Sequence, residues 1–144
     1  MNLKNLSKNL VKFLKLSNQF LIVGSLFLST SIFPAVQVIK PSENSYQDIQ
    51  EALILAEPGD IIRLSAGVFS LEDSLSLDVA GVQIEGEGMS QTILDFSNQL
   101  SGAQGLSVTS NNVTLQDFAI QNAKGDAIKV KGVTNIKFLR VKTE

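Results

Sequence analysis

The sequence has no histidine, cysteine or tryptophan, and it has a single tyrosine among 144 residues. Without histidine, the commonest general base near neutral pH and the usual ligand of zinc or copper are both missing. Without cysteine, thiol catalysis, disulfides and an N-terminal lipid anchor are excluded. The shortage of tryptophan and tyrosine also leaves few aromatic platforms for sugar rings. These absences narrow the chemistry more than they narrow the fold.

The leader, residues 1–42, contains no acidic side chain. Four lysines, the last of them Lys15, precede an apolar run over residues 20–28. A run of about 9–14 apolar-biased residues is typical of a signal-peptide core and is shorter than the roughly 20 needed to cross a bilayer. We therefore expect a helical, cleaved signal peptide over residues 1–35, a linker over 36–44, and a secreted or periplasmic bacterial protein. A membrane-surface helix and a retained signal anchor are the alternatives.

The region after the leader repeats its apolar pattern. Leu106 recurs as Ile128 and Val113 recurs as Ile136, which gives a period of about 22 to 23 residues. Leu75 precedes Leu106 by one such period plus an insertion of about nine residues. Such a period is typical of a solenoid, in which each unit buries its inner face only against its neighbours.

Within each unit, apolar and polar residues alternate, as in Val82-Gln-Ile84 and Ile136-Lys-Phe138. This alternation predicts short strands, and the glycines and asparagines between them predict turns. No intervening segment is long enough for a crossover helix, and the leucine-rich-repeat consensus is missing. We therefore predict an all-β parallel β-helix over residues 58–144, with about three to four coils of three short strands each.

A helix is predicted over residues 45–57, with Ser45 as its N-cap and Asp48 in its first turn. Pro58 and Gly59 end it. Its apolar stripe suits a lid on the open end of the stack, where strand edges and apolar side chains would otherwise be exposed. The stripe comprises Ile49, Ala52, Leu53 and Ala56.

The order of these segments resembles the start of bacterial right-handed parallel β-helix proteins of the pectin-lyase-like superfamily. The resemblance covers residues 45–144 and implies a right-handed coil. It also implies that the chain is an N-terminal portion, truncated inside a strand and lacking a complete active site. The matching segments are 49–53, Pro58-Gly-Asp-Ile-Ile-Arg-Leu64, Ala66-Gly67, Val82-Gln-Ile-Glu-Gly-Glu-Gly88, 92–94 and Lys124-Gly-Asp-Ala-Ile-Lys-Val130.

Asp95 and Asp117 are candidate site residues because they lie one period apart in the sequence. If stacked, their backbones would be about 4.8 Å apart, and paired carboxylates at that spacing can bind Ca²⁺ or act as an acid and a nucleophile. The alternative is two solvated aspartates beside inward-facing Phe96 and Phe118. No other cofactor is indicated, and the resemblance implies Ca²⁺ only in some full-length relatives.

The resemblance also implies that Lys129, Lys131 or Arg140 could take a proton from an acidic sugar, as lyases of the superfamily do. Once the leader is removed, eight bases and 14 acids remain, so the net charge is −6, yet six of the eight bases fall within residues 124–144. This basic cluster suits an acidic polysaccharide, or it is a solvated face that discourages edge pairing. The charge pattern indicates no nucleic-acid partner.

We therefore expect an exported, carbohydrate-associated repeat protein in which this chain supplies the cap and first coils. One alternative is the N-terminal part of a polysaccharide lyase, epimerase or glycoside hydrolase. Another is a non-enzymatic periplasmic binding or maturation factor. The membrane would take part only through the signal peptide, and the last coil, with Ile136, Phe138 and Val141, would promote self-association.

Overall fold

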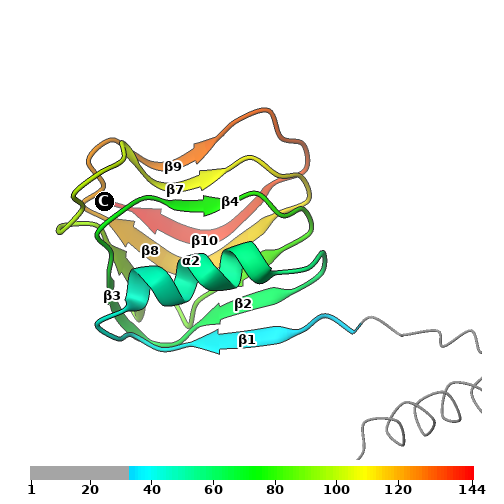
Figure 1. The fold of residues 1–144 in the computed structure, drawn as a ribbon, viewed down its shortest axis with the longest axis horizontal. Coiled ribbons are helices and arrows are strands. Elements are labelled where there is room, and N and C mark those ends of the chain that lie inside the picture. Colours follow the sequence, from blue (N-terminus) through cyan, green and yellow to red (C-terminus); the bar gives the residue numbers. More distant parts are fainter. Residues whose placement is uncertain (1–32) are drawn as a thin grey trace, which may run out of the picture. The chain divides into compact units, whose positions relative to one another are not determined.

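The computed structural model describes residues 33–144, and this part of the chain is mainly β, with one short helix and sheets whose strands all pair in parallel (Figure 1). The predicted signal peptide lies outside these residues, apart from its end at 33–35. Within residues 33–144, no helix has both the length and the apolar character needed to span a bilayer. The elements are β1 (Val36–Ile39), α2 (Ser45–Leu55), β2 (Ile61–Leu64), β3 (Gly67–Ser70), β4 (Leu75–Leu77), β5 (Gln83–Glu85), β6 (Thr92–Asp95), β7 (Gln104–Val108), β8 (Thr114–Gln121), β9 (Asp126–Val130) and β10 (Lys137–Thr143).

The strand register confirms the predicted spacing. In the sheet β4-β7-β9, Leu75 pairs with Leu106, which in turn pairs with Ile128. In the larger sheet, Ile84 of β5 pairs with Leu115 of β8, which pairs with Phe138 of β10. Like residues therefore lie over like residues, because the alternating pattern sends every second side chain to the same face.

Strand β8 bends sharply and so curls the larger sheet. Its first half pairs with β5, and its second half pairs with β6, where Ala119 faces Ile93. The bend falls at Asp117, whose φ of 62° is in the left-handed region. Gly86 follows β5 at the same corner, and an added Cβ there would lie only 2.3 Å from the carbonyl oxygen of Asp117. The corner thus needs glycine in one layer and a left-handed residue in the next.

The predicted insertion is divided between two loops. The sequence separation between paired residues decreases along this layer. It is about 31 residues between β5 and the first half of β8, about 26 between β6 and the second half of β8, and about 22 between β7 and β9. The separation therefore shortens once across the loop after β5 and again across the loop after β6, so each loop contains part of the insertion. The one-period register proposed for Asp95 and Asp117 is wrong, because β6 is still out of step with β8 and Asp95 pairs with Gln121.

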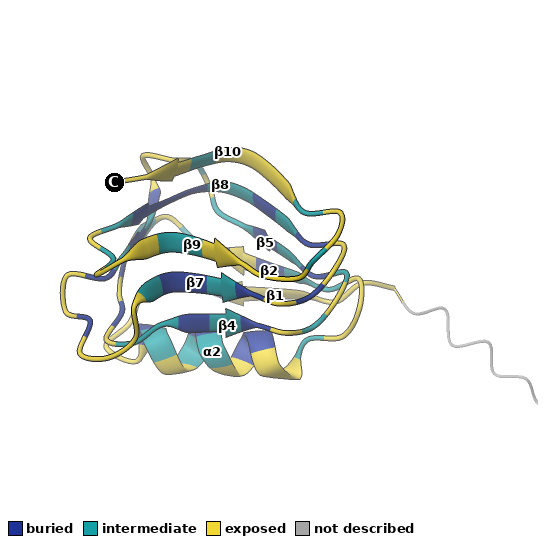
Figure 2. Cartoon of the chain, turned by 90° about the horizontal axis from the view of Figure 1, so that it is seen from above, coloured by how far each residue is buried: buried dark blue, intermediate teal, exposed yellow. Residues whose placement is uncertain are grey.

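A continuous apolar core fills the space between the sheets (Figure 2). The side chains of β4 and β7 are mostly buried, whereas those of β9 and β10 are mostly exposed. Phe69, Phe96 and Phe118 are fully buried, so the inward orientation predicted for the last two is confirmed. Phe138, in the last layer, is 46% exposed.

Helix α2 covers the β4 end of the stack, and its buried Ile49, Ala52 and Leu53 confirm the predicted apolar stripe. The predicted cap is wrong: Asn44 is the N-cap and makes no side-chain capping bond. Ser45 is instead a buried first residue whose hydroxyl bonds the backbone of Ser42. The helix ends at Leu55, earlier than the predicted end at residue 57.

The predicted linker over residues 36–44 also needs correction, because it contains β1. This strand pairs in parallel with β2, and Val36 faces Ile61. Its alternating sequence, Val-Gln-Val-Ile, could have indicated a strand, but so short a segment next to a leader gives a weak signal.

Candidate functional site

The structure does not bring Asp95 and Asp117 together. Asp95 faces Gln121 on one side and Ser70 on the other. Asp117 lies at the bend of β8 instead. The calcium site and the acid–nucleophile pair both depended on adjacent carboxylates, so neither is formed by these two residues. In the described part of the chain, no three acidic side chains converge as metal ligands.

Asp95 is held as a carboxylate by hydrogen bonds from the loop after β6 and from the turn after β8. The Ser97 amide and the Asn122 side-chain amide donate to its Oδ1 at 3.0 and 2.8 Å, and the Ser97 hydroxyl donates to Oδ2 at 2.9 Å. Burial raises the pKa of Asp95, but the hydrogen bonds from Asn122 and Ser97 outweigh it and the pKa falls below its usual value. A carboxyl group with a lowered pKa is a poor proton donor near neutrality.

Asp117 is paired with Arg140, another candidate residue. The guanidinium Nε and Nη2 lie 2.5 and 2.8 Å from the two carboxylate oxygens, a bidentate arrangement. The hydrogen bonds from Arg140 and its positive charge lower the pKa of Asp117. The same hydrogen bonds and the negative charge of Asp117 raise the pKa of Arg140. Arg140 has a φ of 52°, so the pair joins two successive left-handed corners of the β8–β10 sheet. Both residues are therefore engaged in a structural contact, and Arg140 is unsuited to accept a proton.

Lys129 and Lys131 are exposed at β9 and just after it. Lys129 stands in a row with Ser107 of β7 and Ser76 of β4. A lysine base needs a desolvated site, and both of these side chains are exposed. These lysines suit binding better than catalysis.

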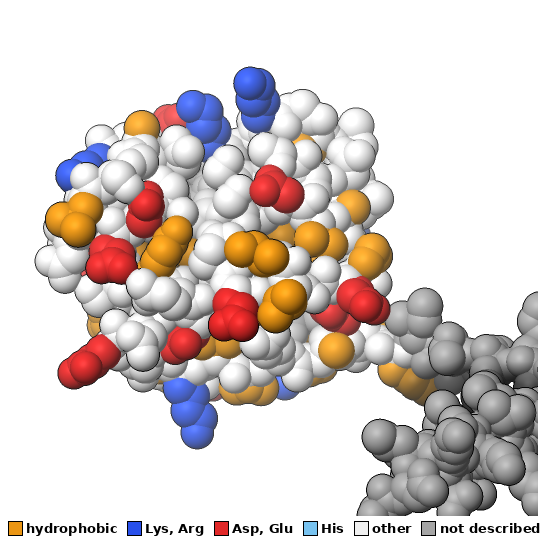
Figure 3. All heavy atoms as spheres, in the orientation of Figure 1, with side chains coloured by type: hydrophobic (Ala, Val, Ile, Leu, Met, Phe, Trp, Pro, Cys, Tyr) orange, Lys and Arg blue, Asp and Glu red, His pale blue; other side chains and the backbone are white. Residues whose placement is uncertain are grey.

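The bases of the last layer form what we call the basic turn. Residues 124–144 carry six bases and two acids, whereas residues 33–123 carry two bases and twelve acids. Figure 3 shows lysine and arginine side chains along the β9 side and at the opposite edge, with acidic side chains spread over the face around α2. The protein is thus electrically polarised along its stacking direction. The basic turn comprises Lys124, Lys129, Lys131, Lys137, Arg140 and Lys142.

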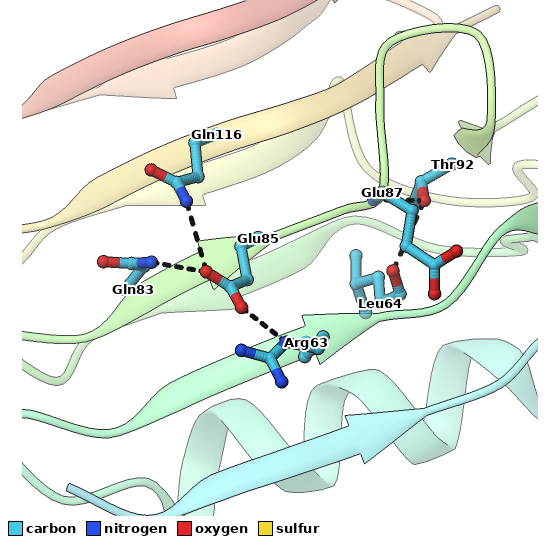
Figure 4. A network of polar contacts seen from close by, with 7 residues as sticks. All are labelled: Arg63, Leu64, Gln83, Glu85, Glu87, Thr92 and Gln116. Carbon is cyan, nitrogen blue, oxygen red and sulfur yellow. Dashed lines mark hydrogen bonds and ion pairs between the residues drawn. The ribbon is translucent and has the colours of Figure 1, made fainter.

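A polar row crosses the outer face of β2, β5 and β8 (Figure 4). Glu85 accepts a 2.5 Å contact from Arg63 on one side and a 3.1 Å hydrogen bond from Gln116 on the other. Gln83, on the same strand as Glu85, donates to the same carboxylate at 2.7 Å. Sequence reasoning missed this row because outward polar residues carry no repeating pattern.

A second feature missed from the sequence is a hollow of about 290 Å³ beside the first turn of α2. Segments from four parts of the chain line it, and it includes the only tyrosine of the sequence. Its position could not be foreseen, because it depends on how the loop after β6 folds back towards the helix. We call it the Tyr46 hollow; its lining residues are Ser42, Glu43, Tyr46, Gln47, Ser70, Glu72 and Asn98.

Comparison with known proteins adds neither a substrate nor a ligand. No family model, curated protein or solved structure matches the chain.

Proposed function

We propose that residues 33–144 form the cap and first coils of a right-handed parallel β-helix in an exported protein. The strand register supports this, since β4, β7 and β9 pair in order while β2, β5, β8 and β10 pair in the same order around the core. Helix α2 closes the β4 end of the stack. The basic, acid-free leader supports export to the bacterial envelope. Mass spectrometry of the exported protein tests the export and cleavage of the leader, and an N-terminus near residue 36 is the expected result.

The coils act as a binding scaffold for an acidic polysaccharide and not as a complete enzyme. The observation that supports this is the charge polarity: the basic turn carries six bases on a protein that is otherwise acidic. Arg140 and Lys142 are paired with Asp117 and Glu144. The other four bases, Lys124, Lys129, Lys131 and Lys137, are exposed and attract a polyanion by long-range electrostatics, even when the overall charge is negative. All six side chains lie on β9, on β10 or in the segments beside β9, and most residues of both strands are exposed.

Affinity electrophoresis through gels containing alginate, polygalacturonate or neutral dextran tests this proposal. We expect retardation by the two acidic polymers, weakened by added salt, and none by dextran. The double variant Lys129→Glu/Lys131→Glu should lose the retardation, whereas Lys40→Glu, near α2, should keep it. Equal retardation of both variants, or retardation by dextran alone, would contradict binding through the basic turn.

A further inference from the structure

The Tyr46 hollow lies where the repeat is broken by an insertion. The loop between β6 and β7 spans residues 96–103, whereas the corresponding turn of the next layer, between β8 and β9, spans only 122–125. Insertions of this kind on a regular scaffold are where binding residues concentrate, because they vary without disturbing the core. This loop contributes Asn98 to the hollow.

The inserted loop is firmly anchored. Gln99 is 2% exposed, and its amide donates to the Ser74 hydroxyl at 3.2 Å and to the Gln104 carbonyl at 2.9 Å. Its side-chain oxygen accepts the Lys124 amide at 3.1 Å. The backbone of the next residue, Leu100, donates to the Glu72 carbonyl at 2.7 Å. A buried and fully bonded glutamine fixes the loop, so the hollow is formed before any ligand arrives.

The walls of the hollow are cross-linked by hydrogen bonds between distant segments. Gln47 of α2 donates to Glu72 at 2.9 Å, and Asn98 donates to Ser70 of β3 at 3.0 Å. These contacts hold amide, hydroxyl and carboxylate groups around the half-buried ring of Tyr46. Preorganised groups lose little entropy on binding, which favours affinity.

The chemistry of the walls selects a class of ligand. Among residues 33–144, no aliphatic side chain and no lysine or arginine lines the hollow, so neither an apolar ligand nor an anion is favoured. Burial, followed by the negative charges of Asp73 and Glu72, raises the pKa of Tyr46, and these two carboxylates are the charges nearest its phenol. Carboxylates and amides form hydrogen bonds with hydroxyl groups, and an aromatic ring packs against the C–H face of a sugar. The volume of about 290 Å³ is near the lower limit of roughly 300 Å³ for small-molecule pockets, which suits a single ring.

We propose that the Tyr46 hollow binds one ring of a neutral saccharide. This site is separate from the basic turn. The hollow binds an uncharged sugar, whereas the basic turn binds an acidic polysaccharide. Each site is therefore tested by its own ligand, and failure of one leaves the other unaffected. Glu72 and Asn98 form hydrogen bonds with the ring hydroxyls, and Tyr46 packs against the ring face.

Nuclear magnetic resonance titration of the protein with cellotetraose and mannotetraose tests this. We expect saturable shifts at the amides of Tyr46, Gln47 and Asn98, with a dissociation constant on the order of 1 mM or tighter for at least one tetrasaccharide. Tetragalacturonate is the anionic comparison and should not cause those shifts at equal concentration. A chitosan tetramer is the cationic comparison, and although the carboxylates attract it, it should bind no more tightly than the neutral tetramers.

Two variants locate the site. Asn98→Ala removes an exposed amide outside the core and should weaken binding about tenfold, as one lost hydrogen bond to a bound ligand does. Tyr46→Ala should abolish the shifts. Gln91→Ala, which removes an exposed amide in the loop after β5, is the matched control and should bind normally. Three results would overturn the proposal. They are the absence of shifts with both neutral sugars at a concentration of about 10 times the expected dissociation constant, stronger binding of either charged tetramer, and unchanged binding by Asn98→Ala.

Discussion

Replacing Phe118 by alanine should be among the most destabilising single changes in the described chain. Its side chain is completely buried, on the second half of β8, where two sides of the curled sheet meet. Truncating a buried phenylalanine to alanine costs about 3–5 kcal/mol, because apolar burial is lost and a cavity remains. Whole-domain stabilities are about 5–15 kcal/mol, so this is a large fraction of the total.

Phe138 is the matched control, since it occupies the next layer with 46% of its surface exposed. We expect Phe138→Ala to cost no more than about 1.5 kcal/mol, in proportion to its smaller burial. Urea unfolding followed by far-ultraviolet circular dichroism and by the fluorescence of the single tyrosine measures both variants. With a denaturant slope of about 1.5 kcal/mol per molar, the Phe118 midpoint should fall by about 2 M or more. Equal losses for the two variants would refute the layered burial described here.

Three further predictions concern pH, backbone conformation and association. Asp95, Asp117 and Glu144 have lowered pKa values in the folded protein, so the stability that they contribute is complete above their unfolded values of about 4 and is lost as pH falls through the lower folded values. Urea midpoints should therefore change little between about pH 5 and 8, where no histidine titrates, and fall below about pH 4, less so in Asp95→Asn. A midpoint that rises on acidification would contradict these pKa directions. Asn112 has a φ of 58° and accepts a 2.7 Å hydrogen bond from Asn135 of the next layer. Asn112→Val should lower the free energy of unfolding by about 1–2 kcal/mol more than Asn112→Gly does, because a β-branched side chain is strained in the left-handed region. Equal free energies of unfolding for the two variants would argue against that conformation. The exposed Val130, Phe138 and Leu139 lie on β9 and β10, in the last layer, so the protein should associate at high concentration, and Phe138→Asp should shift sedimentation towards the monomer. Identical sedimentation of the original protein and Phe138→Asp would show that this surface does not mediate association.

The stacking was predictable from the sequence because inward residues repeat. Leu75, Leu106 and Ile128 must all be apolar to fill the core, so their spacing reveals the register directly. The stripe of α2 was visible for the same reason, since a single buried face imposes the helical period on the apolar residues.

The candidate site was less predictable because outward residues are not constrained by burial. Asp95 and Asp117 share a spacing by coincidence, and only the division of the insertion between two loops shows that their layers are out of step. Arg140 was assigned chemical roles from its charge, whereas its left-handed φ and its contact with Asp117 make it a corner residue. The Tyr46 hollow depends on how the loop after β6 folds, and no local pattern records that.

Engineered disulfides test the stacking most directly, because the sequence contains no cysteine to interfere. Ser107 and Lys129 face each other on neighbouring strands β7 and β9, about 4.8 Å apart at the backbone, which is within disulfide range. Ser107→Cys/Lys129→Cys should therefore oxidise to an intramolecular disulfide and raise the unfolding free energy by about 3 kcal/mol, as expected for a loop of this length. Ser76→Cys/Lys129→Cys places the cysteines two strands apart, at about twice that distance, and should stay reduced. Ready oxidation of the second pair but not the first would contradict the register on which the whole account depends.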